Sequence, residues 1–304
     1  MRLFFFAGIF LLPLSLLSQQ DCLVGKVFPA PELSEAARKN HEAKLTEAES
    51  NYQRDSLNAD NIIWLGRRWA YLGEYTKAIE IFSKGVILYP EDAKMYRHRG
   101  HRYITLRCFD KAIADFTKAS KLIKGKTDEV EPDGLPNAKN IPTSTLQSNI
   151  WYHLGLVYFL KGDYKKALNA YKECLKVSKN PDMYVATANW LYIILRRLNK
   201  EKKAASLLSI ISPDMDIIEN NDYLQILLLY NQRTSIADPI RYLRSEKQGL
   251  GLASFGYGLG NYLLLNGETE KANKVYRLIT DSNQWSSFGY IAAEAELMRM
   301  NNAR

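Results

Sequence analysis

A repeat of 34 residues runs through the middle of this 304-residue chain and restricts its fold more than any other feature. The first two units begin 34 positions apart, at Ala59 and Ala93. A third begins at Ser148, after 21 additional residues. A period of this length indicates that each unit is one small structural element stacked on its neighbours, so the chain forms a single elongated array and not two globular domains.

The three units repeat the same apolar, aromatic and small side chains at matching positions. In order they are Leu65, Gly66, Trp69, Tyr75, Ala78, Phe82 and Pro90, then Tyr96, Gly100, Tyr103, Phe109, Ala112, Phe116 and Ala119, then Trp151, Leu154, Gly155, Tyr158, Tyr164, Ala167 and Tyr171. This pattern resembles the tetratricopeptide repeat, W-x2-L-G-x2-Y followed by A-x3-F and P. The resemblance implies an all-α fold, a right-handed α-solenoid of about five to six antiparallel helix pairs, some of them degenerate.

The order of segments also resembles a group of uncharacterised exported bacterial tetratricopeptide proteins, a resemblance that brings no known activity. We expect a signal peptide at 1–18, a linker at 19–31, an N-terminal packing helix at 32–57, units one and two at 59–126, an acidic, proline-containing insert at 127–147, units three and four at 148–216, and degenerate helix pairs with a closing helix at 217–304.

The first segment is typical of an export signal. Arg2 precedes an apolar run at 3–17, which is too short to cross a membrane comfortably, and Ser18 suits a cleavage site that leaves Gln19 as the first mature residue. We therefore expect a periplasmic or secreted protein. Retention of the chain in a membrane through residues 3–17 is the alternative.

The three cysteines are too few for a disulfide framework. Cys108 and Cys174 fall in different repeat units, and Cys22 lies near the mature start, without the sequence that lipid modification requires. We expect no structural disulfide.

The chain is basic, with 41 Lys and Arg against 33 Asp and Glu and a formal net charge of +8. Basic and aromatic residues together suit single-stranded nucleic acid, but the export signal argues against that partner, and we expect none. In the resembled family, ligand contacts come from fixed positions on the first helix of each unit, which line the inner face. Here the resemblance assigns them to Arg67, Tyr71, Lys94, Arg97, His98, His101, Tyr152, His153, Phe159, Asn189, Trp190, Arg196 and Arg197. These residues predict a basic, aromatic-lined groove for an extended acidic or carboxylate-bearing peptide. Alternatively, several of the arginines only solvate an exposed helix face.

The insert carries four acids within six residues, at Asp128, Glu129, Glu131 and Asp133. One hypothesis is that it folds over the basic inner face and narrows it. The other is a solvated loop at the outer edge.

No motif for catalysis, a metal or a cofactor stands out. His98 and His101 are close enough to share a helix face, but they lie among arginines that would repel a metal cation. We find no nucleophile beside a base and no phosphate loop, and we expect no enzyme activity and no cofactor. The favoured function is a non-enzymatic scaffold that binds a protein or peptide after export. The alternatives are a membrane-anchored envelope adaptor or assembly factor that docks cell-wall or polysaccharide machinery and, less favoured, a single-stranded nucleic-acid binder.

Overall fold

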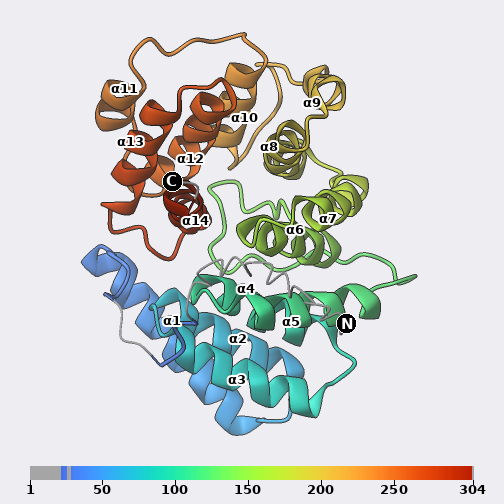
Figure 1. Cartoon of the computed structure of the whole chain (residues 1–304). Coiled ribbons are helices and arrows are strands. Elements are labelled where there is room, and N and C mark those ends of the chain that lie inside the picture. The colour runs from blue at the N-terminus through green and yellow to red at the C-terminus, as the bar shows by residue number, and fades with distance from the viewer. Residues whose placement is uncertain (1–21, 26–28, 303–304) are drawn as a thin grey trace, which may run out of the picture.

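The computed structural model describes residues 22–25 and 29–302, and within them the chain is all-α, which confirms the predicted fold class (Figure 1). The helices are α1 (Glu35–Arg54), α2 (Ala59–Tyr71), α3 (Tyr75–Leu88), α4 (Ala93–Thr105), α5 (Phe109–Leu122), α6 (Leu146–Leu160), α7 (Tyr164–Val177), α8 (Pro181–Arg197), α9 (Glu201–Leu208), α10 (Asn221–Tyr230), α11 (Pro239–Glu246), α12 (Gly249–Leu265), α13 (Thr269–Thr280) and α14 (Phe288–Asn302). The expected export signal and its cleavage site lie outside the described residues. Among the helices that are described, none combines the length and the apolar character needed to cross a membrane.

The three clear repeat units are the helix pairs α2–α3, α4–α5 and α6–α7. The two helices of a pair approach closely because the first helix has a glycine where they meet. A Cβ at Gly66 would lie 2.5 Å from the Phe82 ring, and one at Gly155 would lie 2.6 Å from the Tyr171 ring. The small residue and the facing aromatic therefore fix the distance between the paired helices.

The turn inside each pair requires a residue with positive φ. Gly73 and Gly162 fill this position in the first and third units, with φ of 88° and 79°. The second unit has Arg107 there, with φ of 57°. A non-glycine residue costs about 1–3 kcal/mol in this conformation, so other interactions must hold it. The Arg107 side chain is 2% exposed, and its Nη2 donates hydrogen bonds to Glu294 and to the Trp285 carbonyl, both at 2.7 Å.

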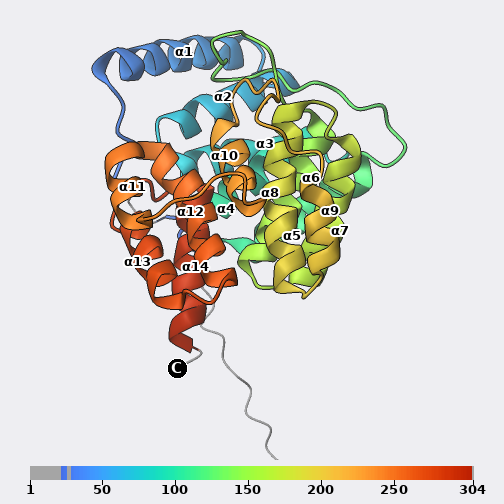
Figure 2. The same cartoon turned by 90° about the horizontal axis from the view of Figure 1, so that it is seen from above.

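These bonds join the second repeat unit to the far end of the chain. The helix pairs curve from α2–α5 through α6–α9 to α10–α13, and α14 returns to the inside of the curve (Figure 1). There α14 contacts α12, α13 and α6, while α12 also contacts α8. The view from above shows α12 and α14 facing the first helices of the repeat units (Figure 2). The solenoid is therefore closed by its own C-terminal helices.

The N-terminal segment is tied to the turn between α4 and α5 by a disulfide between Cys22 and Cys108, so the expectation of no structural disulfide was wrong. The backbone N–H of Leu23 donates to the Leu106 carbonyl at 2.8 Å and aligns the segment beside this turn. The two cysteines are 86 positions apart in sequence, and only the stacked helix pairs bring them together. Cys174 is buried and unpaired.

Candidate functional site: a basic face under an acidic insert

The predicted groove residues fall into two groups in the structure. Those on α6 and α8 face the C-terminal helices, whereas most of those on α2 and α4 face the insert. The two groups do not form one continuous open groove.

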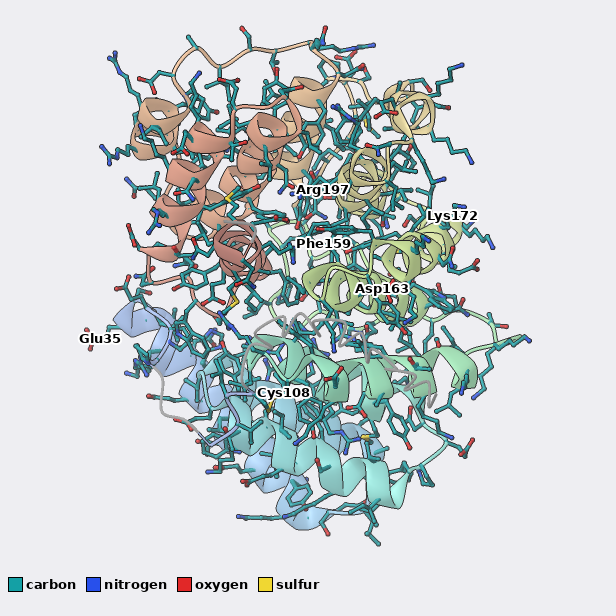
Figure 3. All side chains as sticks on the ribbon, viewed as in Figure 1. Glu35, Cys108, Phe159, Asp163, Lys172 and Arg197 are labelled. Carbon is teal, nitrogen blue, oxygen red and sulfur yellow. A yellow bond between two sulfur atoms is a disulfide. The ribbon has the colours of Figure 1, made fainter. Side chains whose placement is uncertain are left out.

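The α6 and α8 group is covered by the chain itself. Tyr152, His153, Phe159, Asn189 and Trp190 are between 0% and 8% exposed. The Tyr257 ring of α12 lies 5.3 Å from Trp190 and 6.4 Å from Phe159, measured between ring centroids. A ligand cannot reach side chains packed in this way, so these five residues belong to the core. Figure 3 shows Phe159 in the middle of the molecule, towards α14.

Phe288, at the start of α14, covers the inner end of α4 and α6. Its ring centroid lies 5.1 Å from that of His101 and 5.3 Å from that of His153. His101, predicted to contact ligand, therefore has the closing helix as one of its neighbours.

The two arginines at the end of α8, Arg196 and Arg197, contact the C-terminal helices. Arg197 lies 3.0 Å from Glu296 of α14, whose side chain is 1% exposed, and it donates to Asn261 Oδ1 at 3.0 Å. Burial alone would lower the pKa of Arg197, but Glu296 reverses this effect and raises it. Arg196 donates to Tyr192 Oη at 2.8 Å and to the Leu265 carbonyl at 3.3 Å. Both arginines therefore join α8 to α12, and Arg197 also joins it to α14.

The second group forms a basic face on α2 and α4, which we define as Arg67, Arg68, Lys94, Arg97 and His98. The acidic insert lies across this face and contacts it through Arg67, Lys94 and Arg97. Figure 2 shows the insert passing beside α2. Lys94 Nζ is 2.9 Å from Glu129, and Arg97 Nε is 2.9 Å from Glu131. The face thus holds a segment of opposite charge.

Glu131 occupies a built carboxylate site. It is 7% exposed, and its oxygens lie 2.9 Å from Arg97 Nε and 3.4 Å from His98 Nε2, while Asn149 Nδ2 donates to it at 2.5 Å. Burial, followed by the charge of Arg97, holds the pKa of His98 well below its usual value. His98 is therefore neutral near pH 7, and Arg97 is the cation that balances the Glu131 carboxylate.

Two further arginines bind the main chain of the insert. Arg67 Nη1 donates to the Pro132 carbonyl at 2.9 Å, and Arg68 Nη1 donates to the Gly134 carbonyl at 3.2 Å. Both guanidinium groups lie over the Trp64 ring, with their Cζ atoms 4.3 and 4.7 Å from its centroid. Trp64 thus orients the two groups that contact the insert backbone. Tyr71, the remaining predicted residue, accepts a hydrogen bond from Arg67 Nη2 at 3.1 Å.

The ends of the insert are fastened away from the basic face. At the first end, Asp128 accepts hydrogen bonds from Thr145 Oγ1 at 2.7 Å and from the Gln147 N–H at 3.0 Å, at the start of α6. At the other end, the Thr143 carbonyl accepts from Asn180 Nδ2 at 2.8 Å. The middle of the insert, residues 129–134, is therefore held at both ends, and we call this segment the strap.

A hollow of about 220 Å³ remains between α2, α4 and the strap. Arg102 lines it, and in the described part of the chain no carboxylate pairs with this guanidinium, whose Cζ lies 5.5 Å from the centroid of the Tyr75 ring. Burial lowers the pKa of Arg102 to about 10, so it stays charged at pH 7. Arg102 therefore places a positive charge beneath the insert, next to the basic face, and no ion pair within the described residues balances it.

The site does not resemble a metal centre. Across residues 22–25 and 29–302, no group of three His, Cys, Asp or Glu side chains is arranged to hold a metal ion. His98 instead contacts Glu131 and stacks on Phe82.

Three contributors were missed in the sequence. Asn149 and Trp64 stand at the second and sixth positions of their units, which are ligand positions in the repeat, and their uncharged side chains drew no attention beside the arginines. Arg68 lies outside those positions, and no signal in the sequence pointed to it.

Comparison with known proteins agrees with this architecture. The family described as "Tetratricopeptide repeat" matches residues 148–181, the α6–α7 unit. This match identifies a tetratricopeptide repeat in the α6–α7 unit, and the all-α helix pairs of the described residues are consistent with a solenoid of such repeats.

The curated protein "BBSome complex member BBS4" of Bos taurus is 28% identical over 137 residues, which are 45% of this chain and 22% of that protein. The chain therefore spans about a fifth of the length of this relative. A solved tetratricopeptide repeat protein from Parabacteroides merdae is 16% identical with a TM-score of 0.47, over 88% of this chain and 94% of that one. YrrB, described as a TPR protein with an unusual peptide-binding site, is 15% identical with a TM-score of 0.43, over 82% and 97%.

Proposed function

We propose that this chain is a non-enzymatic scaffold that binds a partner protein through an extended acidic segment on the basic face of α2 and α4. One observation carries the proposal. The face already holds such a segment, with the Glu131 carboxylate buried against Arg97, His98 and Asn149. A surface that desolvates and pairs one carboxylate has the chemistry to take another from a partner.

The charge of the face supports an acidic partner. Four of its five residues are cationic, and Arg102 adds a further positive charge beneath the strap. The curated relative is itself a member of a protein complex. The inner side of α6 and α8 is closed by α12 and α14, so the proposal is confined to the first two units.

The test uses a variant in which residues 129–135 are replaced by a glycine-serine segment of equal length. Asp128 is retained because it accepts hydrogen bonds from Thr145 and Gln147 at the start of α6. Fluorescence anisotropy with a labelled hexaglutamate peptide should show binding that weakens at least tenfold when Arg97→Glu is added. Lys172→Glu is the matched control, because Lys172 is exposed on α7, at the outer edge (Figure 3). Absence of binding, or equal losses from the two charge reversals, would refute the proposal.

We also propose that the protein acts after export, in an oxidising compartment. The Cys22–Cys108 disulfide supports this, because such bonds persist mainly outside the reducing cytosol. The basic residue and apolar run at the start of the sequence point the same way. Mass spectrometry of the mature chain tests it. A soluble chain that begins at Gln19 supports export with cleavage, whereas an intact N-terminus in the membrane fraction supports the anchored adaptor.

A further inference from the structure

We infer that residues 129–134 are a resident ligand of the basic face, and that the partner carries a segment of the same chemistry, with two carboxylates two residues apart followed by proline. This inference rests on the proposed function and specifies its partner. Its basis is that the strap is recognised in three separate ways, each of which a segment from another protein could reproduce.

The first is the spacing of the two carboxylates. Val130 forms an isolated antiparallel bridge with Thr145, so the strap is extended at this point. Side chains alternate in extended backbone, which turns Glu129 and Glu131 towards α4 and leaves Val130 61% exposed. Residues two apart on an extended strand are about 6.6 Å apart, close to the roughly 5–6 Å between helix positions three apart, such as Lys94 and Arg97. The spacing of the two carboxylates on the strap therefore matches the spacing of Lys94 and Arg97 on α4.

The second is recognition of the main chain. Arg67 and Arg68 donate to the carbonyls of Pro132 and Gly134, which any sequence could provide in the same backbone conformation. Proline fixes its own φ near about −65° and biases the residue before it towards extended backbone, so it lowers the entropy lost on binding.

The third is a steric limit where the strap crosses α2. A Cβ at Gly134 would lie 1.9 Å from Tyr71 Oη and 2.7 Å from Arg67 Nη2. A larger residue would displace the flexible ends of Tyr71 and Arg67, whereas glycine leaves the hydrogen bond between them in place. The segment that the face accepts is thus Glu-x-Glu-Pro-x-Gly, as in Glu129–Gly134.

The strap must leave before a partner can bind. Asp128 and Asn180 hold the two ends, so residues 129–134 can lift once the hydrogen bond from the Leu146 N–H to the Glu129 carbonyl, at 2.9 Å, also opens. A tethered competitor lowers the apparent affinity of the partner in proportion to the fraction of time that the face is free. If the strap covers the face for about nine-tenths of the time, intact protein binds roughly tenfold more weakly than protein without the strap.

The experiment uses a labelled peptide with the sequence of residues 127–137, titrated into the glycine-serine variant and into the intact protein. We expect the variant to bind the peptide at least tenfold more tightly than the intact protein does. The same peptide with Glu131→Gln, and a scrambled peptide, should each bind the variant at least tenfold more weakly. Intact protein with the single change Glu131→Gln is a milder second variant and should bind the peptide better than the unchanged protein does.

Each outcome separates the two ideas. If hexaglutamate binds the variant but the 127–137 peptide binds no better than its scrambled form, the resident-ligand inference is wrong and the proposed function stands. If intact protein and variant bind the peptide equally, the strap does not compete, and the inference is again wrong. If no acidic peptide binds a variant whose circular dichroism shows a folded chain, both ideas fail.

Discussion

Reduction of the Cys22–Cys108 disulfide should destabilise the fold by an amount that the length of its loop predicts. The cysteines are 86 positions apart, and closing a loop of that length in the unfolded chain removes conformational entropy worth about 4.6 kcal/mol at 25 °C. This figure is an upper bound, because the reduced native segment can detach locally. The contacts that hold it near Cys22 include the bond from Leu23 N–H to Leu106 and one from Gly25 N–H to Thr76 at 3.2 Å. We expect a loss of about 2–4 kcal/mol.

Urea unfolding followed by circular dichroism measures this loss directly. The oxidised protein is compared with the same protein in dithiothreitol and with the Cys22→Ser, Cys108→Ser double variant, which should unfold like the reduced protein and ignore the reductant. Alkylation of the denatured, oxidised protein should label Cys174 alone. Identical midpoints for oxidised and reduced protein, or three labelled thiols in protein purified without reductant, would show that the bridge is not part of the fold.

Three further predictions concern the core. Glu294→Ala leaves the buried Arg107 guanidinium without this carboxylate and should lower the free energy of unfolding by about 3–5 kcal/mol in a urea titration. Arg107→Gly combined with Glu294→Gln should lower it by less, because glycine adopts the positive φ without strain. Burial lowers the pKa of His153 to about 3, below its unfolded value near 6.5, so the unfolded chain binds a proton first and stability falls as pH drops through this range. At pH 4.5 the loss from this residue is about 2.7 kcal/mol, and a His153→Gln variant should show a smaller difference between urea midpoints at pH 7 and pH 4.5. Gly155→Ala places a methyl group 2.6 Å from the Tyr171 ring and should lower stability by about 1–3 kcal/mol. A Gly155→Ala variant that melts with the unchanged protein would contradict the packing argument.

The helix pairs were predictable because their signals are local. A small residue at Gly66 facing an aromatic at Phe82 recurs one period later at Gly100 and Phe116, and each such pair needs only its own unit to fold as expected. The basic face was predictable for the same reason, since Lys94 and Arg97 lie on one side of a single helix.

The rest depended on contacts between distant segments. Nothing around Trp190 distinguishes an open ligand position from one that Tyr257 covers, because the covering helix lies more than fifty residues further along the chain. The disulfide between Cys22 and Cys108 was not predicted for the same reason, because it joins segments that are distant in the sequence. One clue was present, because Arg107 stands where the neighbouring units have Gly73 and Gly162, and a residue that is strained in a turn needs a partner elsewhere.

The closing helix also fixes how many repeats this protein can contain. An open solenoid can gain or lose a unit by duplication or deletion, since each unit contacts only its neighbours. Here an extra helix pair between α5 and α12 would move α14 by roughly 8–10 Å, the usual distance between packed helices. Arg107 and Glu294, now 2.7 Å apart, would then be separated. The contact between α14 and the second repeat unit therefore limits the number of repeats that this fold can contain.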